Sequence, residues 1–266
     1  KKAAWLLLPT LLCGVFLVGA GVSDSLMMFV SFVMMAHILP ALRVPLLTEI
    51  YHENYPTRRR GFYHSFALIA SQVTVVGFGY WAGQRLDADL ESWRSIYLIM
   101  AGAAICSALA LKQIPSSPTL SVRTRNPLKA FRWLRHDKAF SYILFIWFTF
   151  GFANLSIMPI RVQYLSQQLD HSPSVVSLLT LVIPEGARLV FLPIWAKLFD
   201  RFNFLIVRIF MNLTFAVGIF LFFHAKGLWL IAVGSLLHGI GFAGGRLDWG
   251  LWVTRMSPRE RTAEYS

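Results

Sequence analysis

The chain has 266 residues, of which 56% are hydrophobic and only 14% are charged, and its mean hydropathy is +0.57. A soluble domain carries about a quarter charged residues, so this composition argues against a soluble protein. The net charge of +12 does not indicate a nucleic-acid-binding protein, because the aromatic residues lie in apolar runs rather than in a basic groove. Cys13 and Cys106 also lie in apolar runs, so we expect neither a disulfide framework nor a metal site.

Apolar runs long enough to cross a bilayer follow one another along the chain. A transmembrane helix needs roughly 20 apolar residues, whereas strands of a membrane barrel are shorter and alternate in polarity. The sequence therefore predicts an all-α membrane protein, a polytopic bundle of eight transmembrane helices. In chain order the predicted spans are 3–22, 25–42, 61–84, 95–111, 139–160, 173–197, 209–225 and 227–245.

The basic residues are distributed unevenly between the connecting loops. If the loop at 53–61 faces the cytoplasm, most of the 25 Lys and Arg residues lie on that side, and only Arg85, Arg94 and Lys226 lie on the other. Basic loops stay in the cytoplasm. We therefore expect both ends of the chain to face the cytoplasm, and the short loops favour a prokaryotic inner membrane.

A basic segment that contains several prolines, 113–138, divides the predicted spans into two sets of four. We expect a first helical bundle over 1–112, a cytoplasmic linker over 113–138 and a second bundle over 139–266. The second span of the first set and the last span of the second set each end beside an arginine that is followed by a proline and another arginine. Parallel repeats of this kind favour a transporter with its site between the halves. The repeated residues are Arg43, Pro56 and Arg60, and Arg246, Pro258 and Arg261.

Three motifs stand at the ends of predicted spans: Glu53-x-x-Pro56-x-x-x-Arg60-Gly61, Trp93-Arg94-x-x-Tyr97 and Ala196-Lys-Leu-Phe-Asp200-Arg201. In this order and topology they resemble signatures of the major facilitator superfamily of secondary transporters. The resemblance implies a pseudo-symmetric fold of two bundles with twelve helices, of which this chain covers the third to the tenth. It departs from the family at Ala196 and Asn203, where glycines are usual, and at Arg255, where an acid is usual.

Charged residues at the inner ends of the spans are candidates for a cytoplasmic gate. Partly exposed ion pairs contribute about 0–1 kcal/mol each, which suits a latch that opens and closes during alternating access. In the alternative interpretation, the same residues only anchor the cytoplasmic loops. The gate candidates are Glu53, Arg60, Asp200, Arg201 and Arg261.

Charged residues within the spans are candidates for substrate or ion binding, because a charge at the bilayer centre costs at least about 2.5–3.5 kcal/mol. Glu185 and Arg188 are three residues apart, so they share one helical face, and Pro184 allows a local break beside them. A self-neutralised structural pair is the alternative. Further candidates, for which inter-helix pairing is the alternative, are Arg43, Glu49, Arg246, Asp248, Asn154 and Gln72.

Other polar residues in the spans have simpler interpretations. Arg161 and Gln163, at the outer end of a span, are expected to reach the membrane interface. His37, His64 and His238 are expected to be packing residues with satisfied hydrogen bonds, and titration near neutral pH is the alternative. The glycines of 239–245 are expected to allow close helix packing.

These features favour secondary transport of a small solute by alternating access, driven by a proton or sodium gradient or by the solute's own gradient. For proton coupling, the candidate acids are Glu185 and Glu49. The alternative is a transporter-derived sensor or scaffold that does not transport. No nucleotide-binding loop, metal-ligand motif or nucleophile elbow occurs in the sequence, so neither an enzyme nor a cofactor is expected. We expect the solute and the lipid bilayer as partners, no nucleic acid, and a monomer.

Overall fold

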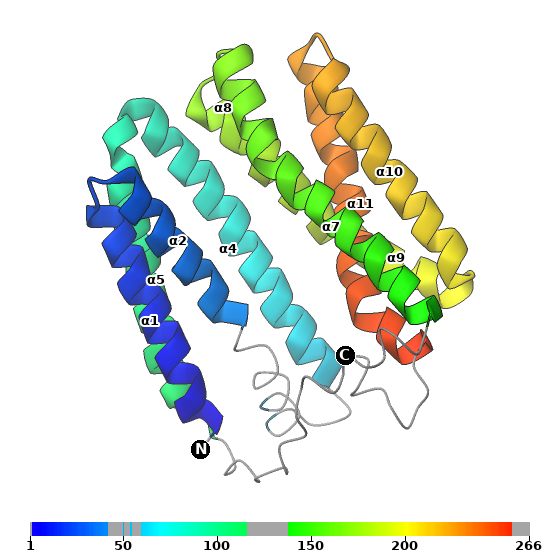
Figure 1. Cartoon of the computed structure of the whole chain (residues 1–266), viewed down its shortest axis with the longest axis horizontal. Coiled ribbons are helices and arrows are strands. Elements are labelled where there is room, and N and C mark those ends of the chain that lie inside the picture. Colours follow the sequence, from blue (N-terminus) through cyan, green and yellow to red (C-terminus); the bar gives the residue numbers. More distant parts are fainter. Residues whose placement is uncertain (1, 42–49, 51–53, 55–59, 116–137, 257–266) are drawn as a thin grey trace. The chain divides into compact units, whose positions relative to one another are not determined.

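The computed structural model describes residues 2–41, 50, 54, 60–115 and 138–256, and among these residues there are helices and turns but no strand (Figure 1). The α-helices are α1 (Lys2–Val22), α2 (Leu26–Ala41), α4 (Arg60–Ala88), α5 (Trp93–Lys112), α7 (Lys138–Gln163), α8 (Pro173–Ser177), α9 (Ile183–Arg201), α10 (Phe204–His224) and α11 (Leu228–Met256). A 3-10 helix, η1 (Leu90–Ser92), and two π-helical segments, η3 (Tyr164–Gln168) and η4 (Leu178–Val182), complete the described elements.

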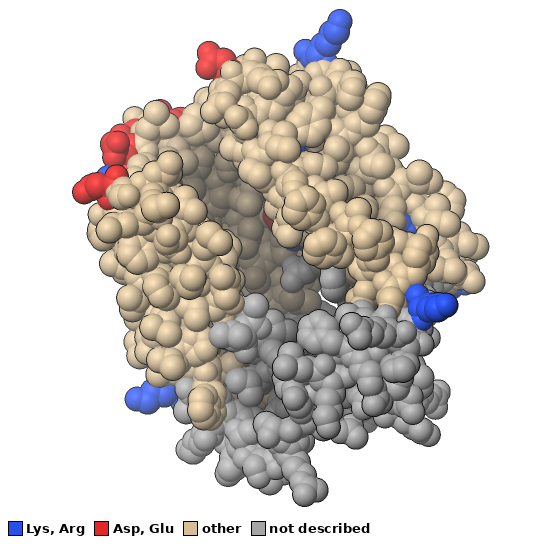
Figure 2. All heavy atoms as spheres, viewed as in Figure 1, with Lys and Arg blue, Asp and Glu red and all other residues tan. Residues whose placement is uncertain are grey.

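The described helices confirm a polytopic all-α membrane protein. Within the described residues, seven helical segments are long and apolar enough to cross a bilayer, and α2 is a shorter apolar helix. Among the differences from the predicted boundaries, α11 ends at Met256 rather than 245 and α10 begins at Phe204 rather than 209. Asn203 caps this helix, its Oδ1 accepting from the Leu205 N–H at 2.9 Å. Arg208 therefore lies within the span. Figure 2 shows that the visible surface of the described residues carries few charged side chains.

The described helices pack into two compact units. The first contains α1, α2 and α5, and the second contains α7 to α11, while residues 71–84 of α4 group with the second. Ser177 holds this part of α4, its Oγ donating to the Gly79 carbonyl at 2.6 Å. The predicted linker lies almost wholly outside the described residues, so the predicted boundaries at 112 and 139 stay predictions.

In the first unit, α1 packs against both α2 and α5 (Figure 1). Leu17, Ala36 and Ala101, one from each helix, form its buried core. Near the turn between α1 and α2, the centre of the Phe29 ring lies 5.3 Å from the ring centres of Trp93 and Tyr97. This contact explains the Trp-Arg-x-x-Tyr motif, whose two aromatic residues hold α2 against the start of α5.

The arginine of the same motif ties the turn between α1 and α2 to α5. Arg94 Nη2 lies 2.8 Å from Asp24 Oδ1, and its Nη1 donates to the Ser23 carbonyl at 3.2 Å. The side chain of Asp24 is 91% exposed, so solvent screens this ion pair. The arginine therefore contributes mainly to the geometry of the turn.

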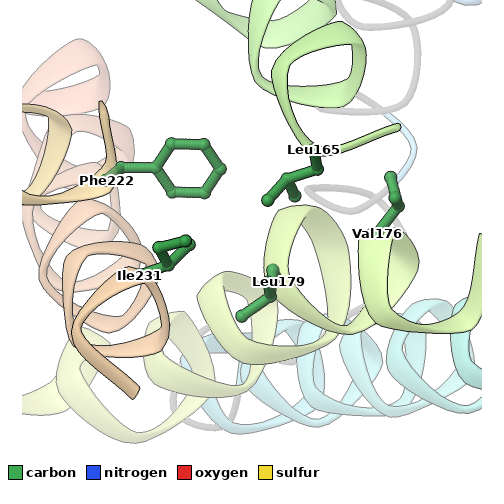
Figure 3. Packing of buried hydrophobic residues seen from close by; sticks show 5 residues of the cluster. All are labelled: Leu165, Val176, Leu179, Phe222 and Ile231. Carbon is green, nitrogen blue, oxygen red and sulfur yellow. The ribbon is translucent and has the colours of Figure 1, made fainter. Parts of the chain in front are cut away.

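The second unit is built on the close approach of α10 and α11. A Cβ added at Gly234 would lie 2.8 Å from the Gly218 carbonyl oxygen, so only glycine fits at this crossing. The α9 helix lies on α11, where Trp195 Nε1 donates to the Ile240 carbonyl at 2.8 Å. Figure 3 shows one core cluster of this unit, formed by Leu165, Val176, Leu179, Phe222 and Ile231.

Candidate functional site

Three of the predicted binding residues meet at the start of α9. Arg188 Nη1 lies 2.7 Å from Glu185 Oε2, and the two side chains are only 11% and 14% exposed. The same carboxylate oxygen accepts a hydrogen bond from Gln72 Nε2 of α4. The Arg188 guanidinium lies over the Phe242 ring of α11, at 4.3 Å from its centre. Glu185 and Arg188 therefore lie on one face of α9, as predicted, and the side-chain amide of Gln72 from α4 contacts this face.

A π-helical segment precedes this pair and sets its position. In η4 the Ile183 N–H donates to the Leu178 carbonyl, five residues back. In the same pattern the N–H of residue 184 would donate to the Leu179 carbonyl. Residue 184 is a proline, which has no N–H, so the Leu179 carbonyl receives no hydrogen bond from it. The predicted local break thus takes the form of a π-helical segment with a carbonyl left for another donor.

That donor is Arg161 of α7. Its Nη2 donates to the Leu179 carbonyl at 2.9 Å and to Ser235 Oγ at 3.2 Å, and its Nη1 donates to His238 Nδ1 at 3.1 Å. The guanidinium lies 4.3 Å from the centre of the Phe222 ring. Because His238 Nδ1 accepts, His238 is neutral in this arrangement, with its proton on Nε2.

The prediction that Arg161 reaches the membrane interface is wrong, because Arg161 is only 2% exposed. Its side chain turns inward toward the acceptors that the π-helical segment and α11 provide. Gln163 remains exposed and donates to Gln167 Oε1 at 3.0 Å. His238 is buried, as predicted, but only its Nδ1 is satisfied, because its Nε2 has no hydrogen-bond partner among the described residues. The signal that the sequence analysis did not use is the three-residue spacing of Ser235 and His238, which places two acceptors on one face of α11.

Asn154 lies elsewhere, in the wall of a cavity of about 230 Å³ that is lined by residues of α7, α10 and α11. Its Oδ1 and that of Asn212 are buried and have no hydrogen-bond partner among the described residues. Arg208 also lines the cavity, with its guanidinium 4.2 Å from the centre of the Trp147 ring. Phe242 is shared, because its ring lines the cavity and also lies under Arg188.

The remaining predicted residues are not placed at this site. Arg201 is exposed at the end of α9. Within the described range, no group of three or more His, Cys, Asp or Glu residues is arranged to hold a metal ion. Arg60, Asp200, Arg246 and Asp248 lie in helices, but their side chains are not described, and Arg43, Glu49, Glu53 and Arg261 lie outside the described residues. The cytoplasmic gate therefore stays a prediction.

Comparison with known proteins identifies the family. A family model described as the Major Facilitator Superfamily matches residues 1–266. Among solved structures, the fold is similar to the crystal structure of a D-xylose-proton symporter, with a TM-score of 0.64 and 18% identity. That match covers 100% of this chain and 69% of the symporter. A search of curated proteins gave no match. At this identity the structural likeness shows the fold alone, but the family match extends over the whole sequence. The chain therefore belongs to the major facilitator superfamily of secondary transporters.

Proposed function

We propose that the chain moves a small solute across the membrane by alternating access, with Glu185 as the acid that couples transport to a proton gradient. The observation that carries this proposal is the position of Glu185, a nearly buried carboxylate that contacts Arg188 of its own helix and Gln72 of α4. A change in the charge of one side chain therefore alters contacts on two helices.

The coupling step follows from the charges. The carboxylate pairs with Arg188 and accepts from Gln72 while it is ionised. A proton removes this charge, weakens both contacts and frees α4 and α9 to separate. Arg188, at 2.7 Å, opposes any added positive charge, but a protonated carboxyl is neutral and can leave the pair, whereas a bound sodium ion would keep its charge beside the guanidinium. The site thus favours a proton over sodium as the coupling ion.

The solute that fits best is rich in hydroxyl groups, such as a sugar, and a negative group on the solute would pair with Arg208 of the same cavity wall. The cavity beside the ion pair has aromatic walls, and the buried amide oxygens of Asn154 and Asn212 accept hydrogen bonds. Hydroxyl groups donate to such oxygens, and the apolar faces of a sugar ring pack on aromatic rings. Phe242 lies between this cavity and Arg188, so that solute binding and the protonation of Glu185 are linked through one side chain.

The test is uptake into vesicles that contain the full-length protein. Glu185→Gln is expected to abolish uphill uptake driven by a proton gradient and to spare solute exchange. Because this variant removes the carboxylate that lies 2.7 Å from Arg188, the double variant Glu185→Gln, Arg188→Met is measured beside it. Glu91→Gln, which changes an exposed acid, is the matched control. Uphill uptake by both Glu185 variants at the control level would refute the coupling role.

Glu49 is the second coupling candidate predicted from the sequence. If Glu49→Gln uncouples uptake and Glu185→Gln does not, the coupling acid is Glu49 and the role of Glu185 is structural. A transporter-derived sensor or scaffold is the alternative function, and it predicts no solute flux in the wild-type vesicles.

The topology and assembly are part of the same proposal. Both ends of the chain are placed in the cytoplasm, with a cell membrane of prokaryotic type as the location, on the basis of the basic loops. The transporting species is taken to be a monomer. Labelling of single cysteines introduced beside Lys1 and Ser266, from each side of the membrane, tests the orientation, and labelling from outside would refute it.

A further inference from the structure

We propose that Arg161 is a positioning residue for transport, which holds the π-helical segment η4 by occupying the Leu179 carbonyl and thereby sets the direction in which Glu185 points. Its effect on transport rests on the proposed coupling role of Glu185. The structural part, the hold on η4, stands on the geometry alone.

The backbone hydrogen bonds of η4 provide the first step. Each N–H in a π-helical segment donates to the carbonyl five residues earlier, as Ile183 does to Leu178. Leu179 would be paired with Pro184, which has no N–H. In a bilayer no water is available to such a carbonyl, so it requires a donor from the protein. Arg161 Nη2, at 2.9 Å, is that donor.

The chemistry of Arg161 provides the second step. Among the described residues, its hydrogen-bond acceptors are neutral: the Leu179 carbonyl, Ser235 Oγ and His238 Nδ1. A buried cation that is not paired with a carboxylate is costly in a membrane, and an apolar side chain would insert more easily. The guanidinium is therefore explained by its several donors in one plane, which reach the π-helical segment and α11 at the same time.

The surroundings make this hold rigid. Phe222 and Leu179 belong to the core cluster of Figure 3, so the guanidinium lies at the edge of a packed apolar group. Gly239, next to His238, lies against Pro184, and a Cβ there would overlap the proline backbone. Arg161 thus stands where α7, η4, α10 and α11 meet, and α11 cannot move without disturbing Pro184.

The consequence for Glu185 follows from helix geometry. A single π-helical turn holds one residue more than an α-helical turn in the same place. In an α-helix each residue is rotated by about 100° about the helix axis relative to the one before it. If η4 loses its donor and becomes α-helical, Glu185 turns by about this angle relative to the preceding helix. It then points away from Gln72, with which it now forms a hydrogen bond.

The test uses Pro184→Ala, which gives residue 184 an N–H that can pair with the Leu179 carbonyl. In full-length protein in lipid nanodiscs, Arg161→Met is expected to speed amide hydrogen exchange in 175–188 at least about tenfold. In the Pro184→Ala background the same change should have less than about a threefold effect, because coupled sites are not additive. Pro193→Ala, which removes a second proline of α9, is the matched control and should not rescue. Two results would refute the proposal that Arg161 stabilises η4. One is amide exchange in 175–188 that Arg161→Met does not change, and the other is a reduced effect of Arg161→Met in both the Pro184→Ala and the Pro193→Ala backgrounds.

Transport by the same variants tests the positioning of Glu185. Arg161→Met is expected to lower the ratio of uphill uptake to exchange and to alter its pH profile, whereas Arg161→Lys retains one donor and restores part of both. A variant with faster amide exchange in 175–188 and an unchanged ratio would overturn the positioning role. If Glu185→Gln itself leaves the ratio unchanged, the proposed coupling role fails, and the amide exchange data still decide the hold on η4.

Discussion

The Glu185–Arg188 pair allows a quantitative test of the site. Glu185→Gln retains an acceptor for Gln72 but removes the charge that lies 2.7 Å from Arg188. At an effective dielectric constant of about 20, two unit charges at this separation attract by about 6 kcal/mol, which sets an upper limit. Removal of one partner of a buried pair costs about 3–5 kcal/mol, because the other charge stays buried without compensation. We expect Glu185→Gln to lower the free energy of unfolding by about 3–5 kcal/mol.

A double-mutant cycle isolates the pair. Arg188→Met alone leaves the carboxylate buried, whereas the double variant Glu185→Gln, Arg188→Met buries no charge and should recover most of the loss. We expect a coupling energy of about 2–3 kcal/mol from reversible unfolding of the full-length protein with a denaturing detergent. Glu91→Gln, whose side chain is 76% exposed, should change stability by less than about 1 kcal/mol. Single variants that each cost less than about 1 kcal/mol, with additive effects, would refute the assignment of a buried ion pair.

Three further predictions concern separate parts of the structure. Asp24→Asn should lower the free energy of unfolding by less than about 1 kcal/mol, and the difference should vanish at high salt, because the ion pair with Arg94 is exposed. Gly239→Ala should cost about 1–3 kcal/mol, measured in the same way, because its Cβ would overlap the backbone of α9; Gly102→Ala, where the structure leaves open space, should not. Asn154→Leu should leave stability unchanged or higher, because a buried acceptor that lacks a partner among the described residues is removed, and should raise the KM for the solute. An unchanged KM would exclude Asn154 from solute binding.

Much of the fold could be predicted from the sequence because membrane insertion depends on local properties. The length of an apolar run determines whether a helix spans the bilayer, and the described helices match the predicted spans closely. The pairing of Glu185 with Arg188 was equally local, since residues three apart share a helical face. The close packing predicted for the glycines of 239–245 is confirmed at Gly239, Gly241 and Gly244, where a Cβ would meet atoms of neighbouring helices. It is wrong at Gly245, where a Cβ would meet open space.

The sequence by itself thus determined the class of protein, the order of the spans and one ion pair of the candidate site. The tertiary structure decided the partners that come from distant segments: Gln72 lies 113 residues from Glu185, and Arg161 lies 77 residues from His238. Arg161 shows the physical reason. An arginine near the end of a span can reach the interface or a buried acceptor, and hydropathy is the same in both cases. Only the fold, which places the carbonyl left by Pro184 beside α7, selects the buried position.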